Sequence, residues 1–103
     1  MVKTDPVKIT VLRKVKIDDL FDKYAAEGFE SECPIFRVGQ EFIARQDYVP
    51  EGFCRWAWAD IFRDVVCLSG GGNYPHIRQE GVMVSGCTGG FRSVIFKLER
   101  IEE

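Results

Sequence analysis

Residues 82–98 read VMVSGCTGGFRSVIFKL, two apolar runs separated by a glycine-rich turn. In the second run Val94, Phe96 and Leu98 alternate with other residues, a pattern typical of a strand with one buried face. We therefore predict a strand near 82–84, a turn at 86–90 and a last strand over 92–101. A short connection of this kind pairs its two strands as an antiparallel hairpin.

Upstream of this hairpin, the N-terminal third of the chain predicts a strand and a helix. Residues 7–11 alternate apolar and polar positions and are rich in β-branched residues, so we expect a strand that runs on towards Val15. Residues 17–27 carry apolar side chains at helical spacing. Asp18 is the expected N-cap of this short helix, and Gly28 its expected stop.

The central part of the chain predicts a second strand and a longer helix. Residues 40–45 form a short strand pattern, with Phe42 and Ala44 on one face. Residues 53–68 have helical periodicity, and the glycine run 70–72 follows them. Glycines after a helix end it, whereas a phosphate-binding loop needs them directly before a helix, so we reject a phosphate site here.

The predicted order of elements is β-α-β-α-β-β. We therefore expect an α+β fold in a single domain, residues 1–103, with about four mostly antiparallel strands and two helices on one face of the sheet. The composition fits a globular protein, because 46% of the residues are hydrophobic and 29% are charged.

Charge and hydropathy limit the partners and the compartment. The formal net charge is −2, so no basic excess favours nucleic acid or an anionic membrane surface. No stretch approaches the roughly 18 apolar residues of a membrane span. The first residues lack the apolar run of a signal peptide, so we expect a cytoplasmic protein with reduced thiols.

The longer helix has two informative faces. On a helical projection its core stripe consists of Cys54, Trp58, Ile61, Phe62, Val65 and Leu68. The opposite side consists of Trp56, Asp60, Arg63 and Cys67. Trp56 either covers hydrophobic surface through tertiary contacts or anchors an interaction surface with Asp60 and Arg63, since Trp and Arg are common interface anchors. Asp60 and Arg63 are also spaced for a local ion pair.

The four cysteines form no Cys-x-x-Cys motif. Cys54 and Cys67 are thirteen positions apart, which is about 20 Å of helix rise, so they cannot ligate one ion. At most Cys33, Cys54 and Cys87 converge, with His76 as a fourth ligand of zinc or another soft metal. The simpler interpretation is that these cysteines pack as small apolar residues and that His76 lies at the surface.

Three segments resemble a known family. They are Cys33-Pro34-x-Phe36-x-Val38-Gly39-Gln40-Glu41-Phe42, then Pro50-Glu51-Gly52-Phe53-Cys54-x-Trp56-Ala57-Trp58-Ala59-Asp60-Ile61, and Arg92-x-Val94-Ile95-Phe96-Lys97-Leu98-Glu99-Arg100. They are similar to small uncharacterised proteins of bacteria and archaea, sometimes described as an uncharacterised repeat protein. The resemblance implies no activity, cofactor or substrate. It implies that Cys33, Cys54 and Cys87 occupy typical cysteine positions and that Cys67 does not. This chain has Cys87-Thr88-Gly89-Gly90 where the family commonly has Cys-Pro-Asp-Gly, and Ser93 where it tends to have proline.

Three functions follow as hypotheses. The first is a non-enzymatic binding or interaction module without a cofactor, which pairs with a second copy of the chain or docks on another protein through Trp56, Asp60 and Arg63. The alternative is a thiol-based metal-binding or redox protein that uses Cys33, Cys54 and Cys87. The third is an enzyme with a cysteine nucleophile assisted by His76.

Overall fold

The computed structural model describes residues 4–45 and 48–102 of the chain. The elements in chain order are β1 (Val7–Lys14), α1 (Asp18–Tyr24), β2 (Glu41–Ala44), α2 (Arg55–Ser69), β3 (Val82–Gly86), the 3-10 turn η1 (Gly90–Arg92) and β4 (Val94–Arg100). The predicted α+β class and the order β-α-β-α-β-β are confirmed. The predicted last strand is shorter than expected, because its first residue belongs to η1.

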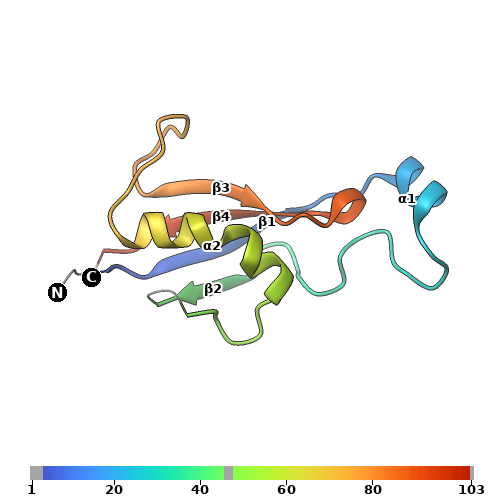
Figure 1. The fold of residues 1–103 in the computed structure, drawn as a ribbon, viewed down its shortest axis with the longest axis horizontal. Coiled ribbons are helices and arrows are strands. Elements are labelled where there is room, and N and C mark those ends of the chain that lie inside the picture. The colour runs from blue at the N-terminus through green and yellow to red at the C-terminus, as the bar shows by residue number, and fades with distance from the viewer. Residues whose placement is uncertain (1–3, 46–47, 103) are drawn as a thin grey trace.

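The four strands form one antiparallel sheet in the order β2-β1-β4-β3 (Figure 1). The hairpin predicted from residues 82–98 is confirmed, with pairs that run from Val82 opposite Glu99 to Gly86 opposite Ile95. The alternation in β1 is also confirmed, because Val7 and Ile9 have no exposed surface. β1 and β4 are the central strands, and the shorter strands β2 and β3 are the edges.

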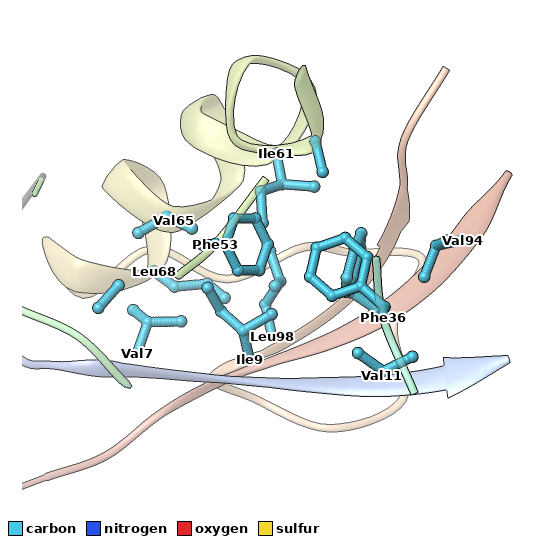
Figure 2. Close-up of a cluster of buried hydrophobic side chains, with 13 residues drawn as sticks. Val7, Ile9, Val11, Phe36, Phe53, Ile61, Val65, Leu68, Val94 and Leu98 are labelled. Atoms are coloured by element: carbon cyan, nitrogen blue, oxygen red, sulfur yellow. The ribbon is translucent and has the colours of Figure 1, made fainter. Parts of the chain in front are cut away.

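The hydrophobic core lies between one face of the sheet and α2 (Figure 2). Two aromatic side chains outside the regular elements complete it: Phe36 from the loop before β2, and Phe53 from the segment before α2. The centre of the Phe36 ring lies 5.1 Å from the ring centre of Phe53 and 5.2 Å from the ring centre of Phe96 in β4. Offset and edge-to-face contacts of this kind stabilise a core beyond the burial of area alone.

Helix α2 is unbroken over 15 residues and begins at Arg55, two residues later than predicted, with Cys54 as its N-cap. Its buried face differs from the predicted stripe: Trp58 is only half-buried, and Phe62 is 37% exposed. Asp64 is buried, although aspartate is normally exposed, and its Oδ1 accepts a hydrogen bond of 2.6 Å from the Tyr74 hydroxyl. The reason is that the segment after α2 folds back over the helix and brings a donor to this carboxylate.

The glycine run ends α2, as predicted. Gly70 is the C-cap, and the amide of Gly72 donates to the carbonyl of Cys67. A Cβ atom at position 72 would lie 2.9 Å from that carbonyl oxygen, so only glycine fits without a shift. The Arg100 guanidinium donates to the carbonyls of Leu68 and Gly72 and so ties the helix end to β4.

Helix α1 differs most from its prediction. It is only seven residues long, its N-cap is Ile17 rather than Asp18, and its C-cap is Ala25, well before Gly28. It lies beyond the end of the sheet and packs against η1, so only α2 covers the sheet face (Figure 1). The apolar spacing predicted a buried face, but no residue of α1 is buried. We call residues 15–35, which run out to α1 and back, the arm.

Candidate functional site

Three of the four cysteines line one cavity of about 400 Å³, here called the thiol cavity. Cys33 comes from the end of the arm, Cys54 from the start of α2 and Cys87 from the connection after β3. All three are half-buried and carry free thiols. Cys67 does not line the cavity, which agrees with the prediction that it stands apart from the other three.

The sulfur of Cys54 belongs to the N-cap residue of α2. Its side chain makes no capping hydrogen bond, while its carbonyl accepts the amide of Trp58 at 2.9 Å. The first amides of a helix lack intrahelical acceptors and carry partial positive charge. The thiol cavity therefore borders a helix end that favours negative charge.

The other two cysteines are held by hydrogen bonds to residues of the sheet. The Cys87 amide donates to the carbonyl of Val94, and the Val94 amide donates to the Cys87 sulfur at 3.2 Å. The Cys33 carbonyl accepts a hydrogen bond of 3.2 Å from Lys14 Nζ, which also lies 3.6 Å from a Glu32 carboxylate oxygen. Each of these cysteines is thus anchored to a strand of the sheet.

Trp56 forms one wall of the cavity and is connected to Asp60 through Thr88. The Trp56 indole N–H donates to the Thr88 hydroxyl oxygen at 3.1 Å. The amide and the hydroxyl of Thr88 both donate to Asp60 Oδ2, at 2.7 and 2.9 Å. Asp60 and Arg63, which are spaced for a local ion pair, have other partners here: Asp60 accepts from Thr88, and Arg63 Nε lies 3.9 Å from Asp64 Oδ1. Sequence reasoning missed Thr88, whose role depends on a contact 28 positions away.

Arg92, the last residue of η1, brings a positive charge to the cavity. Its guanidinium lies 5.5 Å from the centre of the Phe29 ring and donates to the Glu30 carbonyl at 3.4 Å. Within the part of the chain that the structure describes, no carboxylate forms an ion pair with Arg92. Arg92 could not be found from the sequence alone, since nothing in its spacing links it to the cysteines.

The structure does not bring His76 to the thiol cavity. Its side chain is exposed, and its ring packs edge-on against that of Tyr74 at 5.8 Å. No group of three or more His, Cys, Asp or Glu side chains among residues 4–45 and 48–102 is arranged to hold a metal ion. The three thiols therefore share a cavity without converging on one point, and the fourth ligand predicted for them lies elsewhere.

Tyr74 forms a polar cluster with Asp64 and Cys67, which lie in the C-terminal half of α2. Burial and the hydrogen bonds to Asp64 and Cys67 raise the pKa of the Tyr74 hydroxyl well above its ordinary value. The hydroxyl therefore stays protonated and acts as a donor to Asp64. This cluster has a structural role, since it fixes the segment after the glycine run to the helix.

Comparison of the chain with protein-family models, with curated proteins and with solved structures gives no match. The family resemblance of the three quoted segments therefore stays a prediction. In the described residues no helix has both the length and the apolar character that crossing a bilayer demands.

Proposed function

We propose that this protein is a thiol-based binding protein whose thiol cavity takes a small, thiol-reactive ligand. One observation carries the proposal: Cys33, Cys54 and Cys87, from three separate segments, line the same cavity. Its volume of about 400 Å³ lies within the range of small-ligand pockets, roughly 300–1,000 Å³. Thiols that served only as packing residues would have no need to face one open volume together.

The separation of the thiols favours a molecule over a bare ion. Zinc would need sulfurs at about 2.3 Å from one centre, an arrangement that the described residues do not hold. A small organic ligand needs only one reactive thiol and a cavity that accepts the rest of it. The walls suit this, since Ile35, Phe36 and Ala57 are apolar and Trp56 adds an aromatic edge.

The test is whether occupancy of the cavity by one group protects the remaining thiols. The reduced protein is treated with one equivalent of benzyl methanethiosulfonate, and singly labelled molecules are isolated. The rates at which N-ethylmaleimide alkylates each remaining cysteine are then measured by peptide mapping. A benzyl label on any cavity cysteine should slow the other two by roughly fivefold or more, because access controls thiol reactivity.

Cys67 is the internal control, because it is half-buried like the others but lies outside the cavity. Its alkylation rate should not change when a cavity thiol carries the label. If Cys33, Cys54 and Cys87 react independently of one another, they do not share a ligand site and the proposal is wrong.

A second candidate function is an interaction module that uses the outer face of α2. It is supported by the exposure of Trp56, 69%, and of the Arg63 side chain, 88%. The partner would be a second copy of the chain or another protein. Sedimentation of the wild type and Trp56→Ala tests the first case: a concentration-dependent dimer lost in the variant supports it, and a monomer at every concentration excludes self-association.

A further inference from the structure

We infer that the ligand of the thiol cavity is a small organic disulfide with carboxylate groups, and that it forms a mixed disulfide with Cys54. This inference rests on the proposed function and adds the chemical class of the ligand and the reacting sulfur. Two features of the same cavity carry it: a set of thiols and a positive charge without a carboxylate partner in the described residues.

Arg92 determines the charge of the ligand. Its guanidinium is oriented by the Phe29 ring and the Glu30 carbonyl, neither of which neutralises it. Partly buried cations are normally paired, because desolvation penalises a lone charge. A carboxylate in the cavity would supply the missing partner, and a guanidinium binds carboxylates through two parallel hydrogen bonds.

Cys54 is assigned as the reacting sulfur by comparison with the other two. The Cys87 sulfur already accepts the amide of Val94, and Cys33 lies on the arm, outside the regular elements of the sheet and α2. The Cys54 side chain makes no capping hydrogen bond and lies at the positive end of a 15-residue helix. The sulfur that attacks a disulfide must be able to reach it, and the Cys54 sulfur is not engaged in a capping hydrogen bond.

The reaction is a thiol–disulfide exchange. Cys54 releases its proton to solvent, and its sulfur attacks one sulfur of the ligand. A bond forms between these two sulfurs while the ligand's own sulfur–sulfur bond breaks. The other half of the ligand leaves as a thiolate and takes up a proton. The ligand is the oxidant, Cys54 is oxidised, and the departing half is reduced.

The experiment compares two small disulfides of similar size and opposite charge: 3,3′-dithiodipropionate, with two carboxylates, and cystamine, with two ammonium groups. Mixed-disulfide formation in the reduced full chain is followed by mass spectrometry and assigned by peptide mapping. Each rate is divided by the rate at Cys54 in the urea-unfolded protein, which removes the intrinsic reactivity of the reagent. We expect the dianion to react at Cys54 roughly threefold to fivefold faster than the dication, as a partly exposed ion pair allows.

Two variants and one salt series keep the test decisive. Arg92→Gln should abolish the preference and Arg92→Lys should retain part of it, while Arg63→Gln should leave it unchanged because Arg63 does not line the cavity. In the wild type the preference should decrease with added salt, a readout that needs no variant to fold.

The outcomes separate the two proposals. Equal normalised rates for both reagents, or reaction at Cys33 or Cys87 instead of Cys54, overturn the inference. If the cavity thiols still protect one another against alkylation, the proposed function then stands. If the cavity thiols do not protect one another, the proposed function is wrong, and so is the inference about the charge of the ligand, which depends on it.

Discussion

The body is formed by the sheet, α2 and the residues that pack on them, among them Phe36, Cys54 and Cys87, whereas the arm consists of residues 15–35. These two regions are stabilised in different ways. Ile9 and Ile61 in the body have no exposed surface, whereas α1 buries no residue and leaves Tyr24 67% exposed. Apolar burial is the main favourable term in folding. The body therefore holds most of the stability of the molecule, and the arm depends on a few contacts with η1.

The thiol cavity lies where these two regions meet. Cys54 and Cys87 belong to the body, whereas Cys33 lies at the return of the arm. Arg92 lines the cavity and also contacts Phe29 and Glu30 of the arm. The body thus positions two of the thiols, and the end of the arm, where Cys33 packs against the core, completes the site. Local opening of the arm would change access to the cavity without unfolding the core.

The largest difference between the regions is expected from removing a phenyl ring in each. Phe36→Ala should lower the free energy of unfolding by about 3–5 kcal/mol, because Phe36 is 1% exposed and packs among aromatic rings. Phe29→Ala, its control in the arm, should lose less than about 1 kcal/mol, the cation–π contact with Arg92 included. Urea denaturation measures both. Equal losses would mean that the arm is as well packed as the body.

A smaller loss is expected when the polar cluster on α2 loses its donor. Tyr74→Phe removes the hydrogen bond to the buried Asp64 carboxylate and should lower the free energy of unfolding by about 1–3 kcal/mol. Because Tyr74 has a raised pKa in the folded protein, the unfolded chain loses this proton first, near its ordinary pKa of about 10.

This gives the prediction its pH dependence. The stabilisation by Tyr74 is fully present below pH ~10 and declines above it, since the folded state then binds more protons than the unfolded state. Chemical denaturation from pH 8 upwards should show that the difference in free energy of unfolding between wild type and Tyr74→Phe becomes smaller above about pH 10. A difference that stays constant into the alkaline range would contradict the raised pKa of Tyr74 in the folded protein.

The smallest effect is expected in the arm itself. Phe21→Ala removes the edge-to-face contact with Phe91, at 5.5 Å, and should cost about 1 kcal/mol of local stability. Amides of α1 should then exchange hydrogen roughly fivefold faster, while the unfolding midpoint of the body stays unchanged. Leu20→Ala is the control on the same helix, since Leu20 is already 42% exposed. A fall in the midpoint as large as that of Phe36→Ala would show that the two regions unfold as one.

The strands could be predicted because their pattern and their environment agree. Val94, Phe96 and Leu98 alternate in the sequence, and all three are buried in the core in the structure. In α1 the apolar spacing was equally regular, but it wrongly predicted a buried face. Such spacing shows that a helix has an apolar face, not that another element packs against it. Asp64 shows the reverse: its type predicted exposure, and the partner that permits its burial comes from a later segment.

The sequence could limit which cysteines share a site, but it could not show that they meet. Cys33, Cys54 and Cys87 were named as the cysteines that could meet, because Cys67 was excluded by helix geometry, and these three do line one cavity. Thr88 and Arg92 were not found, since their roles arise from contacts across 28 and 62 positions of the chain. Local patterns carry no signal for such contacts.

The pairing of β1 with β4 has a mechanical consequence. Val7 lies opposite Arg100, and the amide of Ile101 donates to the carbonyl of Pro6, so the start of one central strand is bonded to the end of the other. Tension applied through both ends of the chain would load these bonds one after another instead of all together. The sheet would peel open from this end at low force. The arm, at the opposite end of the two strands (Figure 1), and the thiol cavity, which is lined by Arg92 just before β4, would be the last parts to bear the load.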